Sequence, residues 1–149
     1  AFEGIKRPVE AITNAAAVTR QLMEDESGIL FTLNMAAVDN NVTFTLPPAS
    51  SSAGVYFDFC FIVDSDDDAD FILTTGLDAT DIYGYVVAGG ANSTVDDFDG
   101  LSKITVDNSV AQSTEGLRMT VLCDGVNWHL SGYIKTVIGT VHLVEAAGA

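Results

Sequence analysis

The chain has 149 residues, 48% of them hydrophobic and 18% charged, which is enough apolar material for one domain with a core. Its 21 acidic and six basic residues give a net charge of −15, which disfavours contact with nucleic acid phosphates and anionic membranes. No apolar run is long enough to cross a bilayer and no export signal is visible, so we expect a soluble protein. Two cysteines, Cys60 and Cys123, do not make a disulfide framework and leave the redox compartment open.

Residues 1–27 differ from the rest of the chain and are predicted to form an N-terminal arm or anchoring segment. A short helix after Pro8 and an extended arm both fit this segment. Residues 39–115 hold fourteen acids and one base, Lys103, whereas the first twenty residues hold three bases with only two acids, Glu3 and Glu10. This contrast indicates that the arm has a different neighbour, and its candidate contact residues are Lys6, Arg7 and Arg20.

Residues 28–149 are predicted to form a β domain, because apolar and polar residues alternate along most of them. The alternation predicts strands at 29–35, 42–46, 55–63, 71–75, 82–88, 103–106, 117–123, 128–135 and 137–144. Segments rich in Gly, Asn, Asp and Ser, such as 88–100, are predicted loops. Short strands without a long amphipathic helix predict an all-β fold, an antiparallel β-sandwich, jelly roll or barrel. Its predicted core centre is the strand that carries Phe57, Phe59 and Phe61.

The segment TVLCDGVNWHLSG at 120–132 holds a cysteine, a histidine and the only tryptophan, so it is a candidate reactive site. If it is a hairpin that pairs Cys123 with Trp128, then Cys123 and His129 point to opposite faces of the sheet. A thiol with no base in reach is not an activated nucleophile. We therefore expect a structural hairpin, with Trp128 in the core and Gly125 in the turn.

This hairpin resembles the final hairpin of β-rich virion proteins of tailed bacteriophages. In that group it follows a Ser-Gly start, an alternating strand, Thr-Leu-Pro, and a Gly before an aromatic strand. The resemblance covers about residues 18–133, and the matching positions are Ser27, Gly28, Thr45, Leu46, Pro47, Gly54, Phe57, Phe59, Gly84, Gly89, Gly90, Asp124, Gly125, Trp128 and Gly132.

The resemblance implies a capsid decoration (cement) protein on the outer surface of the virion. Such a protein is typically a homotrimer that binds the major capsid protein and stabilises the shell, and its family positions are structural. Under this reading the arm with Lys6, Arg7 and Arg20 is the candidate capsid contact.

Two other functions remain open. A tail fibre or spike module would bind host surface glycans, and Tyr83 and Tyr85, which share one face of a predicted strand, are its candidate contacts. A secreted or surface β-sandwich from a bacterium is the third reading.

One group of acidic residues is a candidate calcium site. Carboxylates alternate in one predicted loop, at Asp64, Asp66, Asp68 and Asp70. The pattern is similar to the opening of a calcium loop, but Ala69 and Thr75 replace its usual glycine and its last acid. Calcium binding and a solvated acidic loop both remain open, and a second acidic group follows at Asp96, Asp97 and Asp99.

Other signs of chemistry are weak. No phosphate loop, zinc spacing or catalytic triad is visible, so we predict no enzyme activity and no cofactor other than calcium. His129 and His142 fall on the last two predicted strands, but two histidines alone do not make a metal site.

Overall fold

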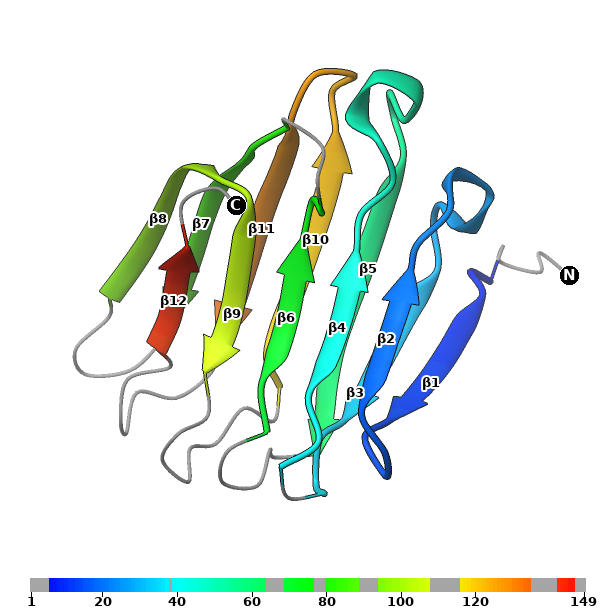
Figure 1. Cartoon of the computed structure of the whole chain (residues 1–149), viewed down its shortest axis with the longest axis vertical. Helices are drawn as coiled ribbons and strands as arrows, with labels where there is room; N and C mark the ends of the chain where they lie inside the picture. The colour runs from blue at the N-terminus through cyan, green and yellow to red at the C-terminus, as the bar shows by residue number, and fades with distance from the viewer. Residues whose placement is uncertain are drawn as a thin grey trace, which may run out of the picture.

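The computed structural model describes residues 6–37, 39–63, 69–76, 80–88, 94–107, 116–134 and 142–146. This part of the chain is mostly β and forms two mixed sheets (Figure 1). The seven-stranded sheet has the order β1 (Val9–Thr13), β3 (Leu30–Asn34), β5 (Tyr56–Val63), β10 (Arg118–Cys123), β11 (Trp128–Ile134), β7 (Ile82–Ala88) and β8 (Thr94–Leu101). The five-stranded sheet has the order β12 (His142–Ala146), β9 (Lys103–Asp107), β6 (Phe71–Thr74), β4 (Val42–Thr45) and β2 (Val18–Gln21). Two 3-10 turns, η1 (Glu24–Glu26) and η2 (Ala49–Ser51), lie in the connections.

The first six strands alternate between the two sheets, so each of β3 to β6 pairs with the strand two before it in the chain. β1, β3 and β5 run parallel in one sheet, and β2, β4 and β6 run parallel in the other. With the parallel β7–β11 pair, five of the ten described ladders are parallel. The prediction of an antiparallel fold is therefore wrong. The first strands pair in parallel because consecutive strands lie in different sheets. Each connection therefore crosses to the other sheet and returns, which is what parallel neighbours require.

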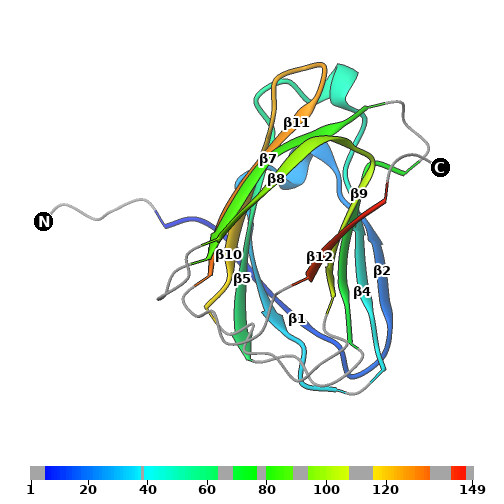
Figure 2. The same ribbon diagram turned by 90° about the vertical axis from the view of Figure 1, so that its left-hand side faces the viewer.

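The two sheets face each other (Figure 2). Buried phenylalanines from both sheets pack between them. Phe31 on β3 and Phe44 on β4 contact across the sheets, with ring centroids 5.2 Å apart. Phe59 on β5 and Phe71 on β6 do the same at 5.4 Å. The structure buries the predicted core residues Phe57, Phe59 and Phe61 completely or nearly so. Since complete burial of a phenylalanine contributes about 2 kcal/mol, this layer stabilises the fold substantially.

β1 and β2 belong to the sheets, whereas the sequence predicts an arm over residues 1–27. β1 pairs with β3 and β2 pairs with β4, so this segment contributes one strand to each sheet. Ile12 and Leu22 are buried in the same core as the phenylalanines. The arm prediction missed these strands because each is short, and in β1 only Ile12 is buried.

Two further strands differ from the predicted elements. β8 (Thr94–Leu101) covers the second half of the predicted loop at 88–100. Asp and Gly are unfavourable in strands, but an edge strand needs pairing on one side only. β12 overlaps the end of the predicted strand at 137–144, and residues 137–141 lie outside the described part of the chain.

The hairpin of β10 and β11 has the predicted register. Cys123 pairs with Trp128, and both side chains are buried. His129 is exposed on the opposite face of the sheet. The predicted separation of the thiol from the imidazole is therefore confirmed.

Candidate interaction surface

Outward side chains of four neighbouring strands, β5, β10, β11 and β7, form one surface, which we call the tyrosine face. The strand register aligns Tyr56, Leu122, His129 and Tyr83 in a row across these strands. The rings of Tyr83 and His129 stack with centroids 6.3 Å apart. The alternating positions on this face are Tyr56, Asp58, Cys60, Ile62, Tyr83, Tyr85, Val87, Arg118, Thr120, Leu122, His129, Ser131 and Tyr133.

Large apolar side chains on the tyrosine face remain open to solvent. Tyr133 is 52% exposed, Tyr85 50% and Leu122 47%. The alternate residues on the same strands, such as Val121 and Leu130, are buried in the core. Contiguous exposed apolar surface of this kind marks interaction sites in soluble proteins.

The tyrosine face is almost uncharged in a strongly acidic chain. Its four strands contain one acid, Asp58, and one base, Arg118, apart from His129. Asp58 forms an ion pair with Arg7 and accepts a hydrogen bond from the Thr120 hydroxyl. The net charge of −15 is therefore carried elsewhere.

The outer face of the five-stranded sheet is different in chemistry. Its register aligns small polar residues, Thr19 with Thr43 and Thr45 with Thr74. Threonine fits a solvated strand without exposing a large apolar group. The contrast distinguishes the tyrosine face from the ordinary outer surface of a sheet in this protein.

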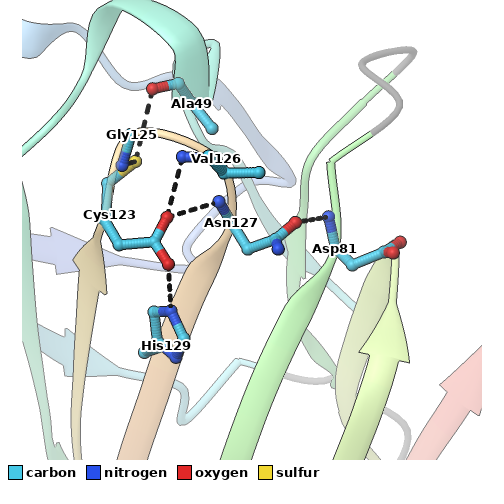
Figure 3. A network of polar contacts seen from close by, with 8 residues as sticks. Ala49, Asp81, Cys123, Gly125, Val126, Asn127 and His129 are labelled. Atoms are coloured by element: carbon cyan, nitrogen blue, oxygen red, sulfur yellow. Dashed lines mark hydrogen bonds and ion pairs between the residues drawn. The ribbon is translucent and has the colours of Figure 1, made fainter.

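A polar network closes the hairpin at the end of the tyrosine face (Figure 3). One carboxylate oxygen of Asp124 accepts hydrogen bonds from the backbone N–H groups of Val126 and Asn127, both at 2.7 Å. The other oxygen lies 2.7 Å from Nε2 of His129. The hydrogen bond from Asn127, followed by those from His129 and Val126, lowers the pKa of Asp124 from 3.8 to about 2. The Asn127 side chain accepts a bond from the Asp81 N–H and so ties the turn to the segment before β7.

We expect the Asp124 carboxyl to titrate near pH 2 when it is followed by NMR. Because its pKa is depressed in the folded protein, its stabilising effect is complete above the ordinary pKa and is lost as the pH falls towards 2. In His129→Gln the pKa should rise but stay below the ordinary value, since both backbone N–H donors remain. An ordinary Asp124 pKa in the unaltered chain would contradict the network.

The Cys123 thiol is held as a core group. It lies 3.5 Å from the Ala49 carbonyl oxygen and accepts a hydrogen bond from the Gly125 N–H at 3.3 Å. Burial raises the pKa of this thiol, which disfavours the thiolate needed for nucleophilic chemistry. Cys60 is also free and is partly exposed on the tyrosine face.

Two of the candidate capsid-contact residues bind within the chain. Arg7 pairs with Asp58 and donates two hydrogen bonds to the Gly28 carbonyl, at 2.9 and 3.1 Å. Lys6 and Arg7 are both exposed in the described structure, and the contacts with Asp58 and Gly28 hold Arg7 in place.

Arg20 closes the edge of the core between β1 and β2. It forms ion pairs with Glu10 and Glu26, and its guanidinium lies 5.3 Å from the centroid of the Phe31 ring. The hydrogen bond with Glu10 raises the pKa of Arg20. Both carboxylates and the ring therefore engage the Arg20 cation within the chain, and its predicted capsid contact stays a prediction.

The calcium and histidine hypotheses fall mostly outside the described residues. Asp64, Asp66 and Asp68 lie in the segment 64–68, which is not described, and the Asp70 N–H donates to Asn41. In the described part of the chain no three His, Cys, Asp or Glu side chains form a metal-binding group. β11, which carries His129, and β12, which carries His142, lie in different sheets.

A groove of about 650 Å³ lies at the ends of β2, β4 and β6. Leu22 and Leu46 form its floor, and Met23 and Pro48 stand at its rim. The Gln21 amide already donates to backbone carbonyls there, including that of Leu22 at 3.0 Å. Its lining residues are Gln21, Leu22, Met23, Glu24, Asp25, Thr45, Leu46, Pro47, Pro48, Thr75 and Gly76. The tyrosine face is therefore the stronger candidate surface.

Sequence reasoning found only part of this surface. Strand parity predicts that Tyr83 and Tyr85 share a face and that Leu122, His129 and Tyr133 share a face, but not that these strands are neighbours.

No helix in the described ranges is long and apolar enough to cross a membrane. Comparisons with protein-family models, curated proteins and solved structures found no match to this chain, so the resemblance to virion proteins stays a prediction.

Proposed function

We propose that this chain is a non-enzymatic structural protein of a tailed-phage virion that decorates the outer capsid surface. In this proposal it assembles as a homotrimer, binds the major capsid protein and bridges neighbouring capsid subunits. The trimer adds buried contact area across the shell and therefore stabilises it. It binds neither nucleic acid nor membrane, because its net charge of −15 repels phosphate groups.

One observation carries this proposal, the tyrosine face. A nearly uncharged surface with half-exposed Tyr85, Leu122 and Tyr133 suits the contact between copies in the proposed homotrimer. The strongly acidic remainder of the chain would then face water and keep decorated particles apart.

For the fold we propose a β-sandwich. The Phe31–Phe44 and Phe59–Phe71 contacts between the sheets support two packed layers. A jelly roll is less well supported, because its strands are antiparallel whereas the first six strands here pair in parallel.

Particle binding tests the function directly. Capsids of the virus that encodes this chain, stripped of it, are incubated with the purified protein and viewed by electron microscopy. We expect regular density on the outer shell and a higher temperature of capsid disruption. A protein that leaves the stripped shells bare and their heat stability unchanged would rule the proposal out.

Glycan binding by a fibre or spike module is the second candidate, because Tyr83 and Tyr85 both lie on the tyrosine face with His129 stacked on Tyr83. Aromatic rings can stack on sugars. A glycan array compares the unaltered chain with Tyr85→Ala. Reproducible binding that is lost in the variant favours this function, and an array without binding removes it.

A further inference from the structure

We infer that the tyrosine face is the surface through which copies of this chain bind one another. This inference rests on the proposed function, since it gives the predicted homotrimer its contact surface. The partners are the other two copies of this chain, and the tyrosine faces of all three meet around the trimer axis.

Charge distribution identifies the partner. Every copy carries a net charge of −15, so two copies can approach closely only through surfaces that lack this charge. β5, β10, β11 and β7 meet this condition, because their single acid, Asp58, is neutralised by Arg7. A cationic partner would instead be attracted to the acidic parts of the chain.

The face has the size of a small protein interface. Its four strands, spaced about 4.8 Å apart, make it about 19 Å wide. These strands of six to eight residues are about 20 to 26 Å long at about 3.3 Å per residue. The resulting area, on the order of 400 to 500 Å² per copy, gives about 800 to 1,000 Å² for two copies together, near the lower end of specific protein interfaces.

Side-chain chemistry favours a protein surface over a sugar. Leu122 and Ile62 are both 47% exposed and have no ring on which a sugar could stack. Leu122 pairs with Tyr56 in the strand register, and tyrosine is enriched at protein interfaces. A second copy covers the aliphatic and the aromatic groups together.

Sedimentation of the full-length chain tests this inference. We expect the unaltered protein to sediment as an assembly of several copies, and Leu122→Asp with Tyr133→Asp to sediment at the 15.7 kDa of one chain. Ser131→Lys provides a milder variant, because Ser131 is small, polar and already exposed on the same face. It should also weaken assembly while the circular dichroism spectrum stays unchanged.

The matched control is Thr43→Asp with Thr45→Asp on the outer face of the five-stranded sheet, which should leave the assembly intact. A single-copy unaltered chain, or a folded Ser131→Lys protein that assembles normally, would overturn the inference. A single-copy chain that still binds capsids overturns the inference alone. Assembled chains that fail to bind capsids overturn only the proposed function.

Discussion

Replacing Trp128 by alanine should lower the free energy of unfolding by about 3 to 5 kcal/mol, measured by chemical denaturation. Trp128 is completely buried and stacks on Phe57, with ring centroids 6.1 Å apart and planes inclined by 25°. Its indole Nε1 has no hydrogen-bond partner in the described part of the chain. The loss therefore comes from packing and from the cavity left between the sheets, with no hydrogen bond to add to it.

Val126→Ala is the matched control for Trp128. Val126 lies in the same hairpin but is 67% exposed, so its truncation should change the stability by no more than about 0.5 kcal/mol. Equal losses for the two variants would mean that the hairpin, and not the buried ring, determines the result. A loss at Trp128 well below the expected range would place the indole against a partner or water.

The sequence predicts which face of a strand each residue occupies much better than it predicts the neighbour of that strand. Alternation places Phe57, Phe59 and Phe61 on one side because a buried face must be apolar at every second position. The same alternation is read whether the adjacent strand is parallel or antiparallel. The sequence therefore contains no local pattern that shows that consecutive strands lie in different sheets.

Ion pairs between distant segments could not be predicted either. Arg7 and Arg20 look like free basic residues in an otherwise acidic chain, but Arg7 meets Asp58 and Arg20 meets Glu10 and Glu26 in the folded protein. Asp58 is far from Arg7 in the sequence, and parallel pairing of β1, β3 and β5 brings them together. The tyrosine face could not be predicted from the sequence for the same reason. Its residues become neighbours only because β5, β10, β11 and β7 lie side by side in this order.

Replacing Gly84 by alanine should also destabilise the protein strongly, by roughly 3 kcal/mol or more. Gly84 pairs with Leu130 in the parallel ladder of β7 and β11, and its φ is +137°, a value that favours glycine. A Cβ atom there would lie 1.7 Å from the Leu130 carbonyl oxygen. Because that oxygen belongs to the backbone, relief requires β7 to move away from β11, which also breaks the row of Tyr83 and His129.

Gly54→Ala separates the two causes of the stability loss in Gly84→Ala, which are backbone strain and the close contact with Leu130. Gly54 also has a positive φ, +82°, but a Cβ atom there meets nothing within 4 Å. Its replacement should therefore cost only the backbone strain, about 1 to 2 kcal/mol. Denaturation of both variants measures the difference, which is the contribution of the close contact between β7 and β11. If Gly84→Ala loses no more stability than Gly54→Ala, the two strands do not approach as closely as the ladder requires.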